Sequence, residues 1–210
     1  TGFRDVDAAA LSTGVSLTGS TAANRLTGGA GADTLDGGTG ADTLAGGGGD
    51  DLALYRGTEA AIDGGAGSNT LRLTTAVAVN LGNSDQTSGD GTSVANFQNV
   101  DAAGLGAAQA VTITGSSGDN VILGGAGDDT IHGAGGADSI AGGGGDDAVD
   151  YWSSEDTLDG GTGTNTLVMK AAATVQLANA DQTSGDGVVV ASFQNIDASG
   201  LSTGASLTGT

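Results

Sequence analysis

The sequence predicts an all-β protein, a solenoid in which short parallel strands stack coil upon coil. A nine-residue line recurs in tandem, with glycines at its start and usually an acidic or amide residue at its sixth position. Leu, Ile, Val or Ala follows two positions later. No stretch shows the 3.6-residue apolar periodicity of an amphipathic helix, which excludes a helical core.

The nine-residue lines form two blocks, residues 19–72 and 115–168. The sixth positions are Asn24, Asp33, Asp42, Asp51, Ala60 and Asn69 in the first block, and Asn120, Asp129, Asp138, Asp147, Asp156 and Asn165 in the second. The blocks recur 96 residues apart, as do the two copies of DQTSGDG that begin at residues 85 and 181. We therefore expect two tandem copies of a 96-residue repeat, cut from a longer array.

The expected organisation is a succession of blocks and spacers. It comprises the end of a preceding spacer (1–18), a first block (19–72), spacer coils (73–114), a second block (115–168), and a second spacer with the start of a third copy (169–210). Two-residue alternation in TLRL, AVAVNL and AVTIT predicts short strands in the spacer, which we expect to continue the solenoid with wider coils. Phe3, Phe97 and Phe193 recur there and are expected to fill the core.

Each line is expected to form one turn and one minimal strand. Glycines accept positive φ and allow close backbone approach, so they suit the turn. The three residues after the sixth position form the strand, and the middle side chain points inward. Two lines then close a flat coil of about 18 residues, and successive coils stack roughly 4.8 Å apart.

Composition limits the partners of this chain. It has 25 acidic and 5 basic residues and a formal net charge of −20, which disfavours nucleic acid and anionic membranes and attracts cations. No run of about 18 apolar residues could span a bilayer, so no membrane insertion is expected. Cysteine is absent, which excludes thiolate metal sites.

Stacking places acidic turns above one another, so like charges meet in a partly dry environment. A hard cation would remove this repulsion and add binding energy to folding. Carboxylates and backbone carbonyls suit calcium, whereas a chain with no Cys and one His serves zinc and copper poorly. Magnesium demands a stricter octahedral shell. The sequence therefore predicts several Ca²⁺ ions.

The lines GGAGADTLD, GGTGADTLA and GGAGDDTIH resemble the nonapeptide GGxGxDxUx of RTX (repeats-in-toxin) proteins. The resemblance implies a parallel β-roll with calcium between turns two lines apart on one edge. The ligands it implies are the side chains of Asp33, Asp42, Asp51, Asp129, Asp138, Asp147, Asp156, Asn24, Asn69, Asn120 and Asn165, with the carbonyls of Gly28, Gly37, Gly46, Gly124, Gly133 and Gly142.

Two lines depart from the pattern. YRGTEAAID at 55–63 has Ala60 at its sixth position, so its calcium site is expected to be absent. YWSSEDTLD at 151–159 loses its glycine pair but keeps Asp156. The four asparagines supply a neutral oxygen, and calcium there should bind more weakly or not at all.

The remaining polar residues have simpler interpretations. We expect surface charges at Asp50, Asp128, Asp146, Asp36, Asp63, Asp150 and Asp159, and a surface position for His132. DQTSGDG is interpreted as turn chemistry, with a further calcium loop as the alternative. Tyr55, Tyr151 and Trp152 replace glycines and indicate a packed edge, with a sugar-stacking patch as the alternative.

No catalytic motif is present, and the five basic residues are scattered, which argues against a polysaccharide-cleaving β-helix enzyme. We therefore expect no enzyme. The resemblance implies a calcium-rigidified repeat segment of a large secreted surface protein of a Gram-negative bacterium, such as a surface layer, adhesin stalk or filament. Its partners would be calcium and neighbouring copies of itself. The alternative is the C-terminal RTX module of a type I secreted hydrolase or toxin.

Overall fold

The computed structural model describes residues 4–202 and 204–209, and these residues form strands and turns without a helix. The all-β prediction is confirmed. The chain divides into two compact units, unit 1 (Thr1–Asp101) and unit 2 (Ala102–Thr210). The strands of each unit pair in parallel, as a solenoid of successive coils requires, and an isolated antiparallel bridge joins Val175 and Thr183 in unit 2.

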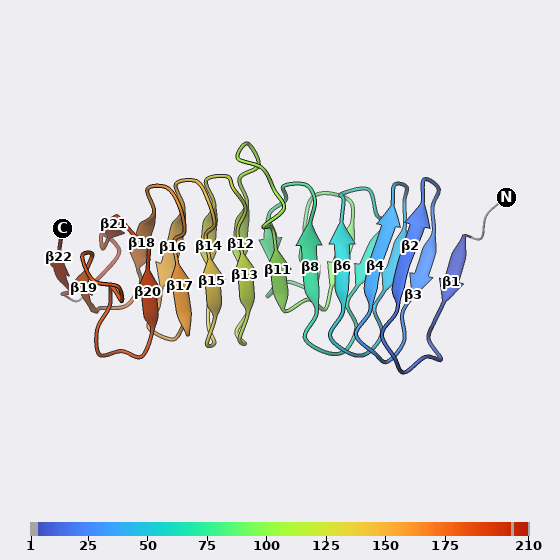
Figure 1. The fold of residues 1–210 in the computed structure, drawn as a ribbon, viewed down its shortest axis with the longest axis horizontal. Coiled ribbons are helices and arrows are strands. Elements are labelled where there is room, and N and C mark those ends of the chain that lie inside the picture. The colour runs from blue at the N-terminus through green and yellow to red at the C-terminus, as the bar shows by residue number, and fades with distance from the viewer. Residues whose placement is uncertain (1–3, 203, 210) are drawn as a thin grey trace. The chain divides into compact units, whose positions relative to one another are not determined.

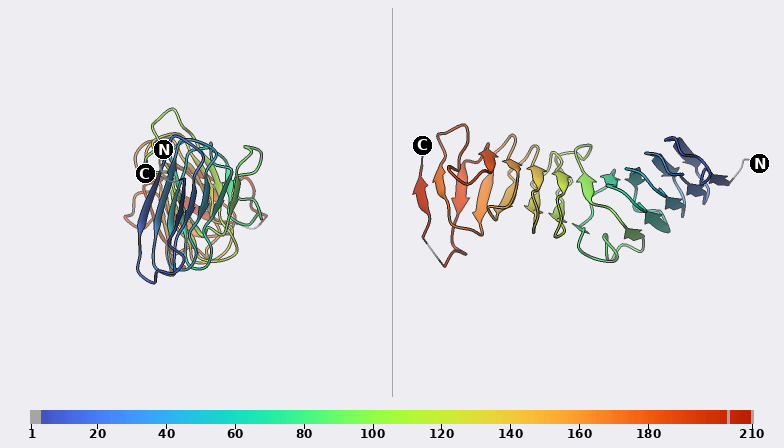
Figure 2. Two further views of the ribbon diagram at one scale, coloured as in Figure 1. Left: turned by 90° about the vertical axis from the view of Figure 1, so that its right-hand side faces the viewer. Right: turned by 90° about the horizontal axis from the view of Figure 1, so that it is seen from below.

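Unit 1 consists of coils whose strands form two parallel sheets (Figure 1). Viewed from its N-terminal side, the coils appear as narrow, elongated loops (Figure 2, left). One sheet has the order β1 (Asp5–Asp7), β3 (Arg25–Thr27), β5 (Thr43–Ala45), β7 (Ala61–Asp63) and β10 (Ser93–Ala95). The other has β2 (Ser16–Ser20), β4 (Thr34–Gly38), β6 (Leu52–Tyr55), β8 (Thr70–Leu73) and β11 (Asn99–Asp101), and β9 (Val79–Asn80) lies in the spacer.

Unit 2 repeats this arrangement. One run of paired strands is β13 (Val121–Leu123), β15 (Ser139–Ala141), β17 (Thr157–Asp159) and β20 (Val189–Ala191). The other is β12 (Thr112–Thr114), β14 (Thr130–His132), β16 (Ala148–Tyr151), β18 (Thr166–Met169) and β21 (Asn195–Asp197), and β19 (Thr174–Gln176) pairs with β22 (Ser206–Thr208).

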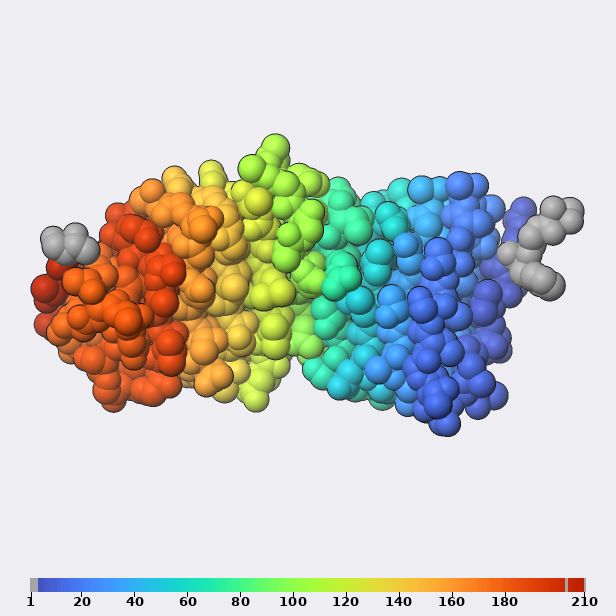
Figure 3. Space-filling model, viewed as in Figure 1, coloured from blue at the N-terminus to red at the C-terminus, as the bar shows by residue number. Residues whose placement is uncertain are grey.

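Strand register confirms the 18-residue coil. Thr34 lies opposite Leu52, and Leu52 lies opposite Thr70, so equivalent residues of alternate lines become direct neighbours. Unit 2 has the same register, with Ser139 opposite Thr157. In the space-filling view, the atoms of successive coils form contiguous bands within each unit (Figure 3).

The spacer strands pair with the block strands through a wider coil. In unit 1, Ala61 lies opposite Ser93 and Thr70 lies opposite Asn99, instead of opposite the residue 18 positions on. The extra chain is held by Gln86, whose amide donates to the carbonyls of Leu81 (3.0 Å) and Phe97 (2.8 Å).

Apolar side chains two residues after each sixth position fill the interior. Leu26, Leu35, Leu44, Ile62 and Leu71 are at most 1% exposed. Their equivalents in unit 2, Ile122, Ile131, Ile140, Val149, Leu158 and Leu167, are likewise buried. Tyr55 and Tyr151, Phe97 and Phe193 are the largest buried side chains, whereas Phe3 lies outside the described residues. The core is a thin layer of aliphatic residues, widened by aromatics beside the spacers.

Candidate metal centre

The sixth-position residues lie in the turns that precede the strands, and nearly all of them point into the coil. In unit 1, one edge carries Asp33, Asp51 and Asn69 before β4, β6 and β8, and the opposite edge carries Asn24 and Asp42 before β3 and β5. All of these side chains are buried, as are the equivalent Asp129, Asp147 and Asn165 on one edge of unit 2 and Asn120 and Asp138 on the other.

One oxygen of each buried aspartate is engaged by the backbone of the preceding coil. The N–H of Asp33 donates to Asp51 Oδ1 (2.8 Å), and the N–H of Asp51 donates to Asn69 Oδ1 (2.9 Å). Unit 2 repeats this ladder through Asp129, Asp147 and Asn165. Each side chain thus satisfies a turn N–H that no strand partner reaches.

The second carboxylate oxygen of four aspartates has no hydrogen-bond partner in the described part of the protein. Oδ2 of Asp42, Asp51, Asp138 and Asp147 is buried and has no hydrogen-bond partner. In Asp33 and Asp129 the same oxygen accepts the N–H of Gly29 and Gly125, each at 2.6 Å. A buried carboxylate oxygen without a donor is costly, and a bound cation is one of the few partners that would satisfy it.

The first glycine of a line keeps space open beside this oxygen. A Cβ at Gly46 would collide with Asp51 Oδ2 and with the carbonyl oxygen of Gly64 in the next coil. Two acceptor oxygens therefore converge on the place that a side chain would fill. The same convergence of a side-chain oxygen and a glycine carbonyl occurs beside Gly28 (Asp33, Gly46), Gly124 (Asp129, Gly142), Gly142 (Asp147, Gly160), Gly19 (Asn24, Gly37) and Gly115 (Asn120, Gly133).

Burial makes the negative charge on these aspartates unfavourable. It raises the pKa of Asp138 and of Asp147 to about 6, and neighbouring acids such as Glu155 and Asp129, respectively, add to the effect. The pKa values of Asp51 and Asp129 are also raised, again chiefly by burial. A site in which the charged form is disfavoured gains from a bound cation.

Among residues 4–202 and 204–209, no three His, Asp or Glu side chains gather as an all-side-chain metal cluster. Each turn with a buried aspartate supplies one carboxylate. Further ligands must therefore be backbone carbonyls, such as those of Gly46 and Gly64. Such oxygen-only, irregular donor sets suit Ca²⁺, which accepts carbonyls and about six to eight ligands. The residues present fit calcium.

The asparagines that end each block differ from the aspartates. The Asn69 amide nitrogen donates to the carbonyls of Asn96 (3.0 Å) and Gly65 (3.3 Å), and that of Asn165 donates to Ser192 (3.1 Å) and Gly161 (3.3 Å). The amide therefore binds the carbonyls directly. The series of backbone-to-side-chain hydrogen bonds ends at Gln98, because the Asn69 N–H donates to Gln98 Oε1 (2.8 Å).

The first asparagine on the opposite edge also has protein partners. Asn24 Oδ1 accepts the N–H of Ser20 (2.6 Å), and its amide donates to the Arg4 carbonyl (3.0 Å). In unit 2, Asn120 Oδ1 accepts the N–H of Ser116 (2.7 Å). These side chains lie beside the carbonyls of Gly37 and Gly133, as their line spacing predicts.

The two glycine-poor turns depart from the sequence expectation. Asp156 is exposed, whereas the preceding Glu155 is 4% exposed and points inward. In unit 1, Ala60 is exposed and Glu59 is 3% exposed. The nonapeptide resemblance implies a calcium ligand at the sixth position, Asp156. In a turn without the glycine pair, the buried acid is instead the fifth residue of the line.

Two of the acids expected to be surface charges, Asp36 and Asp150, form ion pairs. Asp150 is 4% exposed and not a solvated surface charge, because its carboxylate contacts His132 Nδ1 (2.7 Å) and Lys170 Nζ (3.5 Å). Asp36 pairs with Arg56 (2.8 Å). His132 and Asp150 are 18 residues apart, which places them on adjacent coils. This separation could have predicted their contact from the sequence.

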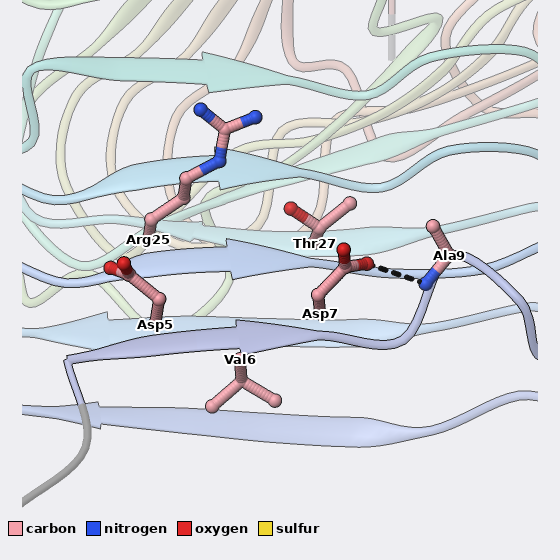
Figure 4. A pocket seen from close by; sticks show the side chains of 6 residues that line it. All are labelled: Asp5, Val6, Asp7, Ala9, Arg25 and Thr27. Atoms are coloured by element: carbon pink, nitrogen blue, oxygen red, sulfur yellow. Dashed lines mark hydrogen bonds between the residues drawn. The ribbon is translucent and has the colours of Figure 1, made fainter.

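A shallow hollow lies over β1 and β3 of unit 1 (Figure 4). Asp5, Asp7, Arg25 and Thr27 point to one side of these strands, and Val6 points to the other. Asp7 accepts the N–H of Ala9 (2.9 Å). The hollow contains none of the predicted calcium ligands.

Comparison with known families agrees with this geometry. Residues 18–53, 114–149 and 153–168 match the RTX calcium-binding nonapeptide repeat, in four copies. The matched segments contain the six buried sixth-position aspartates, Asp33, Asp42, Asp51, Asp129, Asp138 and Asp147. A comparison with curated proteins gave no match. Within the described part of the chain, no helix is long and apolar enough to cross a lipid bilayer.

Proposed function

Because this chain carries RTX calcium-binding nonapeptide repeats, which bind Ca²⁺, we propose that it is a structural segment of a large secreted bacterial surface protein, rigidified by extracellular calcium. A surface layer, an adhesin stalk or an extracellular filament of a Gram-negative cell would use such a segment. RTX repeats are typical of extracellular secreted proteins.

The observation that carries this proposal is the set of four buried Oδ2 atoms without a partner, those of Asp42, Asp51, Asp138 and Asp147. Bound Ca²⁺ would supply the positive charge that these oxygens lack. We assign the ligands to the aspartates Asp33, Asp42, Asp51, Asp129, Asp138 and Asp147. Beside Asp33, Asp51, Asp129 and Asp147, the carbonyls of Gly46, Gly64, Gly142 and Gly160 would be further ligands. Asn69 and Asn165 would close the block without an ion, because their amides already bind the facing carbonyls.

A structural role is favoured by the repetition of spacer as well as block. The spacers use the same contacts in both copies, such as Gln86 with Phe97 and Gln182 with Phe193. The net charge of −20 should keep the calcium-free chain loose in the cytosol. Calcium at the cell surface would then fold it, and repeated segments would add length.

The test is a calcium titration followed by circular dichroism. We expect β-structure to appear as calcium rises from submicromolar to millimolar, and to disappear in excess chelator. Asp51→Ala and Asp147→Ala should each shift the midpoint to about tenfold higher calcium, since the number of charged ligands tunes affinity.

The matched controls are Asp50→Ala and Asp146→Ala, which alter the exposed neighbours of these ligands. Each control loses one exposed hydrogen bond, to Ser68 and Thr164 respectively, and should retain the wild-type midpoint within about twofold. An identical spectrum in calcium and in chelator would refute calcium-dependent folding.

A further inference from the structure

The turn at residues 151–156 of unit 2 is built differently from the glycine-rich turns. Its sequence is YWSSED, and Ser153 takes the positive φ (69°) that glycines adopt elsewhere. Glu155 points inward and is 4% exposed, whereas Asp156 is exposed. An acidic residue is thus retained inside the coil although the repeat pattern is lost.

Glu155 is held in place as a carboxylate by the backbone of its own turn. Oε1 accepts the N–H of Trp152 (2.8 Å), and Oε2 accepts the N–H of Ser154 (3.1 Å). The geometry therefore places a second carboxylate in the interior of this edge.

Asp138 lies in the turn of the preceding coil, beside this one. The Asp138 carbonyl accepts the N–H of Asp156 (2.9 Å), and Ser139 pairs with Thr157, so the two turns are stacked. Asp138 is 1% exposed; its Oδ1 accepts the Asn120 N–H (2.9 Å), and its Oδ2 has no partner. Burial raises the pKa of Asp138 to about 6, and the charge of Glu155 contributes to this rise.

No basic side chain balances this pair in the part of the chain that the structure describes. The basic groups in the ion pairs of unit 2 are His132 and Lys170, and both contact Asp150. Two buried carboxylates on stacked turns repel each other, and a cation with oxygen ligands is the partner that relieves the repulsion.

Unit 1 contains the same arrangement. Asp42 is 0% exposed with an unpartnered Oδ2, and Glu59 is 3% exposed. The Glu59 carboxylate accepts the N–H groups of Arg56 and Thr58, each at 3.1 Å. The Arg56 guanidinium pairs with Asp36 instead. The arrangement therefore accompanies the glycine-poor turn in both copies.

We propose that Asp138 and Glu155 form a further divalent-cation site, which takes Ca²⁺ although its turn lacks the glycine pair, and that Asp42 and Glu59 form its counterpart in unit 1. Glu155 replaces the sixth-position aspartate as the acidic ligand, and Asp156 takes no part. The inference rests on the proposed calcium-dependent fold but concerns sites at which the nonapeptide pattern fails.

Trp152 makes this site observable. It is the only tryptophan of the chain, it lies in the turn, and its backbone N–H binds Glu155. Terbium(III) replaces Ca²⁺ at oxygen sites, so excitation at wavelengths absorbed by tryptophan alone should give sensitised terbium emission from a nearby ion. We expect Glu155→Gln to lower the terbium affinity of this signal about tenfold or more and to remove one bound calcium in equilibrium dialysis.

Asp156→Asn is the matched control, because it neutralises the adjacent, exposed acid; it should retain both the emission and the calcium count. Unchanged emission and calcium count in Glu155→Gln would overturn the site and leave Glu155 as a turn cap only. Should Glu155→Gln fail to fold, the wild-type protein still decides, because absence of Trp152-sensitised emission in the terbium-loaded chain also overturns it.

Circular dichroism of the wild-type protein separates this result from the proposed function. Folding on calcium addition without sensitised emission contradicts the Glu155 site alone. No response of the wild-type spectrum to calcium contradicts the calcium-dependent fold itself.

Discussion

At the residue scale, each buried aspartate divides its two oxygens between different roles. Asp51 Oδ1 accepts a backbone N–H from the coil before it, and Asp51 Oδ2 is buried with no protein partner. Asparagine can perform the first role and not the second, as Asn69 illustrates by turning its amide nitrogen to a carbonyl. The residue type at the sixth position, Asp or Asn, therefore indicates which turns need a cation.

Protons should partly replace calcium on these aspartates. Burial raises the pKa values of Asp138 and Asp147 to about 6, above their ordinary value of 3.8. A raised acid pKa in the folded state contributes stability that is fully present below about pH 3.8 and is lost as the pH rises through about 6. In excess chelator, the β-structure that is lost at about pH 7.5 should therefore return as the pH is lowered to about 5, which circular dichroism measures.

The control for this titration is the Asp138→Asn/Asp147→Asn double variant, in which neither position can take up a proton. Its β-structure in chelator should depend less on pH, leaving only the contribution of surface carboxylates. An equal pH dependence in the variant and in the wild type would show that these two aspartates do not carry the effect.

At the element scale, the glycines of a turn determine whether an ion has room to bind there. Gly46 leaves room for Asp51 Oδ2 and the Gly64 carbonyl to approach the same point. In the turn at 151–156, the glycine pair is absent and a different residue points inward. Glycine therefore sets the orientation of the acid as well as the tightness of the turn.

Two substitutions in one turn test this role of glycine. Gly46→Ala places a Cβ against Asp51 Oδ2 and the Gly64 carbonyl, and it should destabilise the calcium-bound protein by about 1 to 3 kcal/mol. Gly48→Ala meets only Ala30 Cα, at 3.8 Å, and should leave stability unchanged or slightly raised. Thermal unfolding in saturating calcium measures both, and equal melting temperatures would contradict the assigned function of Gly46.

Much of each element follows from the nine-residue period. The inward Leu35 is a correct prediction, because it depends on strand alternation and coil length. The inward turn of Glu155 does not follow, because it depends on how a glycine-poor turn folds and on the backbone N–H groups that bind the carboxylate. The burial of Asp150 requires the coil-to-coil register that brings His132 beside it.

At the scale of the whole molecule, a thin core limits what apolar burial can contribute to each unit. One buried Leu contributes about 1.5 to 3 kcal/mol, whereas ordering each residue costs on the order of 1 to 2 kcal/mol. At free calcium tenfold above its dissociation constant, each independent site adds about 1.4 kcal/mol. Several sites in one unit can therefore decide its folding equilibrium.

The wide spacer coils were predictable as strands but not in their internal contacts. Alternation in AVTIT predicts the strand Thr112–Thr114, and the structure pairs it with Thr130–His132. The contacts of Gln86 with Leu81 and Phe97 could not be derived, since they depend on the path of a coil that leaves the 18-residue geometry.

The most direct measurement is an anomalous diffraction map of the protein crystallised with calcium, together with its thermal unfolding in calcium and in chelator. We expect ion density between Asp51 Oδ2 and the Gly64 carbonyl, and between Asp147 Oδ2 and the Gly160 carbonyl, and a far lower melting temperature in chelator than in calcium. Turns without ion density, in a chain that melts at the same temperature in both buffers, would contradict calcium-dependent folding.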